Sequence, residues 1–101
     1  MSETIEKLIK TIKSRKGNDV KSSYTSFLLS KGNDHCLNKL KEEMTELEDA
    51  IKNKKNTVHE TADVIYHLLV TLESADIHFD DIIKELKKRE ATSGFEEKRN
   101  R

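Results

Sequence analysis

Residues 62–72 form a stretch in which apolar side chains point in nearly every direction around the axis of a helix. The sequence there is Ala-Asp-Val-Ile-Tyr-His-Leu-Leu-Val-Thr-Leu. A helix that is apolar on all sides must be buried on several of them. The chain has no proline and three glycines, which favours long helices with few breaks. We therefore expect an all-α fold, with four to five helices forming a bundle.

The proportions of apolar and charged residues limit the size of the core. Of the 101 residues, 34% are hydrophobic and 38% are charged, which leaves a thin core for one domain. We expect this domain to cover residues 1–90, with a charged tail over residues 91–101. A homodimer that completes the core is the expected assembly.

Apolar periodicity and end signals predict where the helices lie. The expected elements are a first helix that Ser2 caps and residues 15–19 end, a short helix within residues 22–32, a third helix from about residue 33 to 52, a fourth from Thr57 and a fifth that His78 caps. Gly17 is the expected C-cap of the first helix. Thr57 and Glu60 fit a capping box, with Thr57 as the N-cap.

The third predicted helix has an apolar seam of the heptad type, formed by Leu37, Leu40, Met44, Leu47 and Ile51. Glu42 and Glu46 lie roughly opposite this seam, whereas Glu43 lies near its edge. Taken alone, these carboxylates fit an ordinary solvated helix face.

The fourth predicted helix carries a stronger signal. Glu60, Asp63 and His67 lie along one narrow line of it, and a carboxylate on a buried helix is costly unless it is paired, hydrogen-bonded or metal-bound. Oxygen ligands favour Mg²⁺ or Mn²⁺, and His67 can orient a ligating acid. Zinc is an alternative, because His59, Asp63 and His67 are spaced i, i+4 and i+8. Capping remains the alternative role of Glu60.

The balance of charges limits the classes of partner that the protein can attract. Lys and Arg total 19, as do Asp and Glu, so no net field attracts nucleic acid or a membrane surface. The single cysteine, Cys36, excludes an internal disulfide, and the charged first residues favour a cytoplasmic protein. No glycine-rich phosphate loop is present, so phosphate binding would depend on separate cations such as Arg15, Lys16, Lys31, Lys39 and Arg89.

The motif Glu-Glu-x-x-Glu at residues 42–46, followed by Glu-x-x-Asp at 60–63, is similar to the metal signature of the all-α MazG-like nucleotide pyrophosphohydrolases. Further motifs narrow the resemblance, namely Arg-Lys at 15–16, Ser-Tyr-Thr at 23–25, Tyr-His-Leu-Leu-Val at 66–70 and Ser-Gly-Phe-Glu-Glu-Lys at 93–98. Together they resemble the phosphoribosyl-ATP pyrophosphohydrolases of histidine biosynthesis. Two departures are Lys41, where the family usually has glycine, and the absence of a proline before Ser23.

The resemblance implies Mg²⁺-dependent hydrolysis of 1-(5-phosphoribosyl)-ATP to 1-(5-phosphoribosyl)-AMP and pyrophosphate. The implied metal ligands are Glu42, Glu43, Glu46, Glu60 and Asp63. Glu43 or Glu46 would take the proton from the attacking water. The implied substrate-binding residues are Arg15, Lys16, Ser23, Tyr24, Thr25, Lys31 and Lys39.

Other readings stay open at this point. A related pyrophosphohydrolase would act on free or damaged nucleotides, and a non-catalytic helical dimer would leave the acids solvated. The resemblance also implies association with a phosphoribosyl-AMP cyclohydrolase, to which members of the family are often fused.

Overall fold

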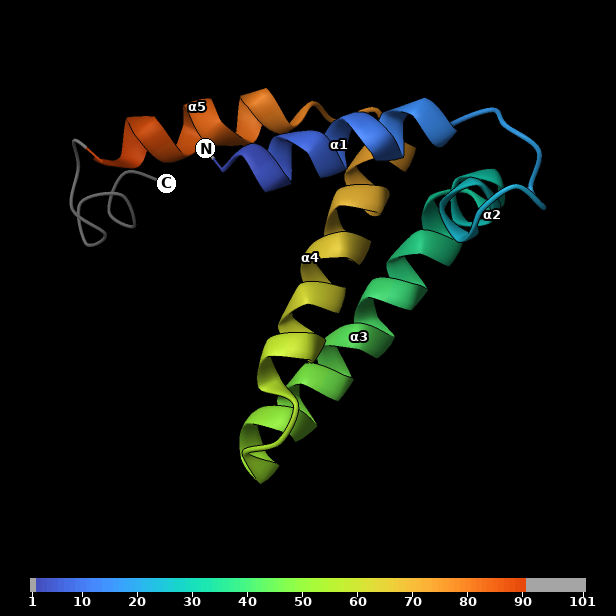
Figure 1. Cartoon of the computed structure of the whole chain (residues 1–101). Helices are drawn as coiled ribbons and strands as arrows, with labels where there is room; N and C mark the ends of the chain where they lie inside the picture. The colour runs from blue at the N-terminus through green and yellow to red at the C-terminus, as the bar shows by residue number, and fades with distance from the viewer. Residues whose placement is uncertain (1, 91–101) are drawn as a thin grey trace.

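The computed structural model describes residues 2–90, which form five α-helices and no strand. The helices are α1 (Glu3–Arg15), α2 (Tyr24–Lys31), α3 (Asn33–Asn53), α4 (Thr57–Ser74) and α5 (Phe79–Glu90). α3 and α4 form a long antiparallel hairpin, and α1 and α5 lie across the end of α4 that is remote from the hairpin turn (Figure 1). The all-α prediction is confirmed, whereas the predicted tail lies outside the described residues.

The ends of α1 follow simple capping chemistry. The Ser2 hydroxyl accepts hydrogen bonds from the backbone N–H groups of Thr4 and Ile5, as predicted. The C-cap is Lys16 and not Gly17. Gly17 comes one residue later with a φ of 81°, a left-handed conformation that glycine adopts without a side-chain clash.

The short helix α2 is fixed by hydroxyl groups at its start. Ser23 is the N-cap, and its Oγ accepts a hydrogen bond from the backbone N–H of Ser26 at 3.0 Å. The buried Ser26 hydroxyl in turn donates to the carbonyl of Arg15 at 3.1 Å. These bonds connect α2 to the end of α1, and they give Ser23 a capping role.

The turn between α3 and α4 differs from the predicted capping box. α4 begins at Thr57 itself, and its N-cap is Asn56, whose side chain makes no capping hydrogen bond. Lys54 and Asn56 both have left-handed backbone conformations, and the Lys55 N–H bonds the Ala50 carbonyl at 3.0 Å. This tight reversal lets the helix start at the expected cap itself, one residue earlier than predicted, so Thr57 and Glu60 do not form the predicted capping box.

The core lies where α1, α2, α3 and α4 meet, and its buried members are Ile12, Leu28, Cys36, Leu69 and Val70. The other half of the hairpin is much less covered. Met44 and Ile51 of the predicted seam are 55% and 58% exposed, and Val58 of α4 is 86% exposed. The expected burial of residues 62–72 therefore holds within this chain only in their second half, where His67, Leu69, Val70 and Thr71 are buried but Leu68 is 40% exposed.

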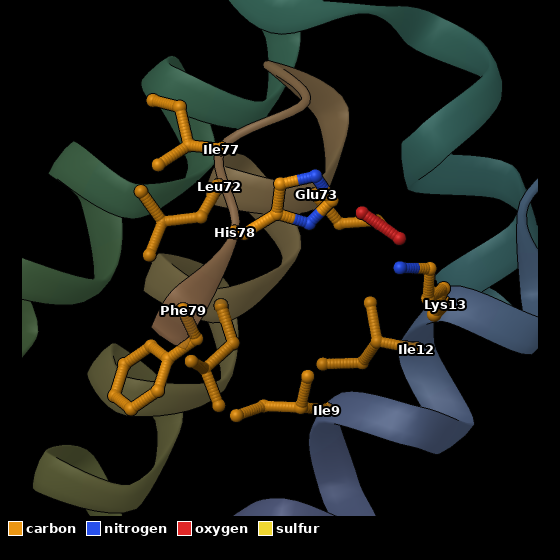
Figure 2. A pocket seen from close by; sticks show the side chains of 9 residues that line it. Ile9, Ile12, Lys13, Leu72, Glu73, Ile77, His78 and Phe79 are labelled. Carbon is orange, nitrogen blue, oxygen red and sulfur yellow. The ribbon is translucent and has the colours of Figure 1, made fainter. Parts of the chain in front are cut away.

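A small cavity of about 40 Å³ lies between α1, the end of α4 and the start of α5 (Figure 2). Ile9, Ile12 and Phe79 contribute its apolar wall, with Lys13 and Glu73 also lining it. A nucleotide needs several hundred cubic ångströms, so this cavity is too small to hold one. No helix among residues 2–90 combines the length and the apolar character that crossing a membrane requires.

Candidate metal centre

The α3–α4 hairpin brings carboxylates of both helices together on one side. Glu43 and Glu46 of α3 and Glu60 of α4 each offer an oxygen, and these oxygens lie within 4.8 Å of one another. Helix periodicity aligns Glu43 with Glu46, and the antiparallel packing of α4 sets Glu60 opposite them. The predicted convergence of acids from the two helices is therefore present.

Glu43 is the most buried carboxylate of the group, with 18% of its side chain exposed. Burial is the main cause that raises its pKa, to about 7, and the neighbouring Glu46 carboxylate adds to the rise, followed by Asp63 and Glu60. Half of the Glu43 groups are thus protonated near neutral pH when no cation is bound. This carboxylate, more than Asp63, bears the desolvation cost that the sequence led us to expect.

Glu60 is in a similar position. Burial raises its pKa, and the charge of Glu46 contributes to the same effect. Among the described residues, Glu43 Oε2 and Glu60 Oε2 are buried without a hydrogen-bond partner. Clustered oxygens that repel one another and lack donors are what a divalent cation would stabilise. The donor set therefore fits a Mg²⁺ or Mn²⁺ ion.

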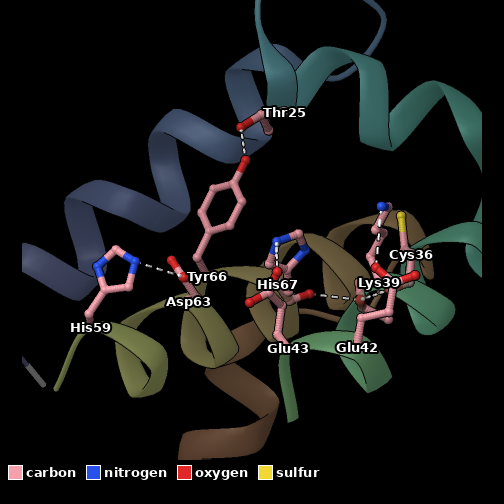
Figure 3. Close-up of polar contacts among 10 residues, drawn as sticks. Thr25, Cys36, Lys39, Glu42, Glu43, His59, Asp63, Tyr66 and His67 are labelled. Carbon is pink, nitrogen blue, oxygen red and sulfur yellow. Dashed lines mark hydrogen bonds and ion pairs between the residues drawn. The ribbon is translucent and has the colours of Figure 1, made fainter. Parts of the chain in front are cut away.

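His67 lies behind the carboxylates, with its Nε2 3.7 Å from Glu43 Oε1 (Figure 3). His67 is 6% exposed. Burial lowers the pKa of its imidazole, although nearby acids oppose that shift. The imidazole is therefore neutral at pH 7. The rings of Tyr66 and Tyr24 meet its ring edge to face, at 5.1 and 6.1 Å between centroids, and these contacts restrict its orientation.

Asp63 lies at the rim of the cluster, with 40% of its side chain exposed. Its Oδ2 is 3.3 Å from the Nε2 of His59, and the two residues form a second group of close donors together with Glu60. Glu42 belongs to neither group; its Oε2 instead accepts a hydrogen bond from Lys39 at 3.3 Å.

Several of the expected substrate-binding residues lie beside the acids. The hydrogen bond to Glu42 is the largest cause that raises the pKa of Lys39, and the charges of Glu42 and Glu43 add to the rise. Tyr24 is 52% exposed, and Thr25 contacts Tyr66 on α4 (Figure 3). Lys31 is more distant from the acids along α2, where its Nζ lies 5.3 Å from the centre of the Phe27 ring.

The first two expected cations are not brought to the carboxylates. Lys16 Nζ lies 2.5 Å from Asp76 Oδ1 and donates to the Glu73 carbonyl at 3.2 Å. Helical rise separates that end of α4 from Asp63 by about 15 Å. Lys16 thus joins the ends of α1 and α4, and the adjacent Arg15 is exposed at the same end of α1.

Two features of the site were not anticipated from the sequence. The first is the hydroxyl of Tyr66, which contacts Thr25 and so connects α4 to α2. The sequence singled out Tyr66 only as part of a family motif. An open recess of about 300 Å³ also adjoins the acids, lined by Glu46, Asp49, Ala50, Asn53, Lys55, Asn56 and Glu60. One wall of this recess could have been found from the sequence, because Glu46, Asp49, Ala50 and Asn53 are spaced i, i+3, i+4 and i+7 on one helix face. The other wall is formed by turn residues, and the left-handed backbone of the turn brings them there.

The contact between the Tyr66 and Thr25 hydroxyls gives a first prediction. Because Tyr66 is half-buried, the loss of this hydroxyl contact in Tyr66→Phe should reduce the free energy of unfolding by about 1 kcal/mol. In a Thr25→Val background the same change should cost nearly nothing, because the partner is already absent. Urea unfolding of the four proteins measures this coupling; equal costs in both backgrounds would show that the contact contributes no stability.

The site defines a class of all-α protein in which carboxylates face one another across an antiparallel helix pair, with an imidazole behind them, a donor set that suits a divalent cation. Comparison with known sequences narrows this class. The family model described as phosphoribosyl-ATP pyrophosphohydrolase matches residues 5–90. The chain therefore belongs to the phosphoribosyl-ATP pyrophosphohydrolase family, and it is an enzyme of the hydrolase class.

Individual relatives agree with this membership. The phosphoribosyl-ATP pyrophosphatase of Rhodobacter capsulatus is 43% identical over 96 residues, which cover 93% of each chain. The enzyme of the same name from Clostridium acetobutylicum is 46% identical over 90 residues, or 87% of this chain and 82% of the relative. A histidine biosynthesis bifunctional protein of Caldanaerobacter subterraneus is 46% identical over 89 residues, which cover 86% of this chain and 43% of that protein.

Proposed function

We propose that this enzyme hydrolyses 1-(5-phosphoribosyl)-ATP between its α and β phosphates, releasing pyrophosphate and 1-(5-phosphoribosyl)-AMP in histidine biosynthesis. The observation that carries the proposal is the carboxylate cluster of Glu43, Glu46 and Glu60 within a chain that matches the family over residues 5–90. The charged substrate cannot cross a lipid bilayer unaided, so we assign the reaction to the cytoplasm.

Glu43, Glu46 and Glu60 are the proposed core of a Mg²⁺ site, and Asp63 completes it from the rim. Bound Mg²⁺ would supply charge neutralisation on the phosphate oxygens and activation of water. Glu42 is held by Lys39, so we assign it an outer position where it orients that lysine. Mn²⁺ satisfies the same oxygen ligands.

Glu43 is the better placed of the two candidate bases, Glu43 and Glu46. Its side chain is the most buried of the cluster, at 18% exposed, and the Nε2 of His67 lies 3.7 Å from one of its oxygens. We propose that Glu43 takes the proton from the attacking water, while Glu46, which is more exposed, faces the incoming phosphates.

The substrate phosphates would meet Lys39 and the side chains at the start of α2. Lys39 pairs with Glu42, the neighbour of Glu43, and Thr25 contacts Tyr66 of α4 (Figure 3). The Tyr24 ring meets the His67 ring at 6.1 Å between centroids. Lys31 would add positive charge from the last turn of α2. Ser23 has its role as the N-cap of α2. Lys16 and Arg15 have a structural position at the end of α1, so we do not include them in the substrate site.

Substrate comparison tests the proposal. Pyrophosphate release should be much faster from phosphoribosyl-ATP than from dCTP or dUTP at equal concentration and saturating Mg²⁺. Faster turnover of dCTP or dUTP would instead make this chain a pyrophosphohydrolase of free nucleotides. Release from none of the three would support the non-catalytic reading.

We also propose that the enzyme is a homodimer. The uncovered side of the hairpin carries two apolar recesses, one lined by Met44, Leu47, Glu48, Ile51, Lys52 and Val64, the other by Thr57, Val58, Thr61, Ala62 and Ile65. We call these residues the hairpin face. Isolated apolar residues at a surface are ordinary, but a contiguous set of this kind favours an interface. A second copy would bury it and complete the thin core.

Ile65→Glu tests this assembly, because a charge within a buried interface is strongly unfavourable. We expect the wild-type protein to be a dimer by sedimentation equilibrium and the variant to be a folded monomer. Val20→Glu is the matched control, since Val20 is an exposed apolar residue outside the hairpin. A monomeric wild type, or a dimeric Ile65→Glu protein, would contradict the proposal.

Association with a phosphoribosyl-AMP cyclohydrolase is a further proposal. It is supported by the bifunctional relative, of which this chain spans 43%. Co-purification of the two separate proteins at micromolar concentration is the corresponding test.

A further inference from the structure

A row of aromatic rings extends from the start of α3 across α2 to α4. His35 of α3 meets Phe27 of α2 edge to face, at 6.0 Å between ring centroids. Phe27 stacks with Tyr24 at 6.4 Å and an interplanar angle of 19°, and Tyr24 meets His67 of α4 at 6.1 Å. These separations are those of favourable aromatic pairs, so each ring restricts the orientation of the next.

Tyr24 is the ring of this row that is open to solvent. It is 52% exposed, whereas His67 is 6% exposed and Phe27 is partly buried. Phe27 is also covered by Lys31, whose Nζ lies over the ring at 5.3 Å from its centroid. Single exposed aromatic side chains are ordinary at a protein surface. Tyr24 differs from them because other rings support it in a fixed orientation, and a flat ligand could stack on its open part.

The row of rings ends at the proposed metal centre. His67 Nε2 lies 3.7 Å from Glu43 Oε1 (Figure 3), so a single imidazole connects the Tyr24 ring to the carboxylate cluster. The next residue of α2, Thr25, contacts Tyr66 of α4, and this second contact holds the start of α2 against the hairpin. A nucleotide with its α and β phosphates at the carboxylates carries its base one sugar away from them, which is the region that the Tyr24 ring occupies.

We infer that the Tyr24 ring is a stacking surface for the adenine base of the substrate. The inference rests on the proposed function and deepens it by assigning a residue to the base. Stacking of a base on an aromatic side chain corresponds to about 5- to 150-fold in affinity. The base does not react, so this stacking is equally strong in the bound substrate and in the transition state. Its loss is therefore expected in KM and not in kcat.

Steady-state kinetics of two Tyr24 variants of the full-length protein with Mg²⁺ test the inference. Tyr24→Leu should raise the KM for phosphoribosyl-ATP about 10-fold or more and leave kcat nearly unchanged. Tyr24→Phe is the matched control, because it removes the hydroxyl and keeps the ring, and its KM should stay close to that of the wild type. Inorganic triphosphate, which has no base, should inhibit Tyr24→Leu as strongly as it inhibits the wild type.

Other roles of Tyr24 would give different results. Equal increases in KM for both variants would assign the effect to the hydroxyl, and weaker inhibition of Tyr24→Leu by triphosphate would show that the phosphate site is disturbed. Dissociation of a dimeric wild type into monomers by Tyr24→Leu would make the ring a subunit contact. Each of these results, or an unchanged KM in Tyr24→Leu, would overturn the inference and leave the proposed function standing. Absence of phosphoribosyl-ATP hydrolysis by the wild type would overturn both.

Discussion

Glu46→Gln is expected to lower the rate of pyrophosphate release from phosphoribosyl-ATP by at least about 100-fold at a fixed Mg²⁺ concentration. Replacing a residue that only supports a metal ligand commonly costs 10 to 100-fold, and Glu46 contributes an oxygen to the cluster directly. The amide keeps the size of the side chain but removes its charge, so the cation loses an anionic ligand.

Kinetics at several Mg²⁺ concentrations measure this effect and distinguish its cause. If Glu46 binds the cation, part of the lost rate should return as Mg²⁺ is raised. Glu85→Gln on α5 is the control, because Glu85 is exposed and, among residues 2–90, forms an ion pair only with Arg89, at 3.6 Å. Equal rates in Glu46→Gln and the control would exclude Glu46 from the site.

The metal-free protein is expected to lose stability as the pH rises from about 4.5 to 7. Glu43 has a pKa of about 7 in the folded protein, against an ordinary value of 4.5. The folded state therefore binds more protons than the unfolded state in this window, and its free energy of unfolding falls with increasing pH. The loss from Glu43 alone reaches at most about 3 kcal/mol, and Glu60 acts in the same direction.

Urea unfolding of wild type and Glu43→Gln at pH 5 and pH 8 isolates this contribution. His67 acts in the opposite direction, because burial lowers its pKa, but it is present in both proteins. Without metal, Glu43→Gln should be more stable than wild type at pH 8 and similar to it at pH 5. Mg²⁺ should stabilise the wild type at pH 8 and much less at pH 5, where protonated carboxyls bind cations poorly. The same pH dependence in both proteins would contradict the burial of Glu43.

The sequence was sufficient to predict the helices, because their apolar periodicity and end signals are local. The main error of the prediction from sequence concerned which carboxylate is buried. Asp63 lies within an apolar stretch, yet it is half-exposed at the rim of the hairpin. Glu43 was placed only at the edge of the apolar seam, yet 18% of its side chain is exposed and His67 of α4 lies beside it. Burial depends on which faces of α3 and α4 meet, and one-helix periodicity does not contain that information.

The residues that hold helices together were also hard to predict. Lys16 was expected to bind phosphate, but its partner Asp76 is 60 residues away in the sequence. Tyr66 and Thr25 are separated by 41 residues, and no spacing rule connects such pairs. The left-handed turn before α4 makes Asn56 the N-cap in place of the expected Thr57. Contacts of long range and turn geometry were thus the missing information.

Restoring Mg²⁺ to the metal-stripped protein while following pyrophosphate release from phosphoribosyl-ATP tests the central claim most directly. We predict no release above the uncatalysed rate in EDTA, and a saturable recovery as Mg²⁺ is added that Glu46→Gln and Asp63→Asn largely lose. Release in EDTA at the rate seen with Mg²⁺, or full recovery in both variants, would contradict the assignment of the carboxylate cluster as the catalytic metal centre.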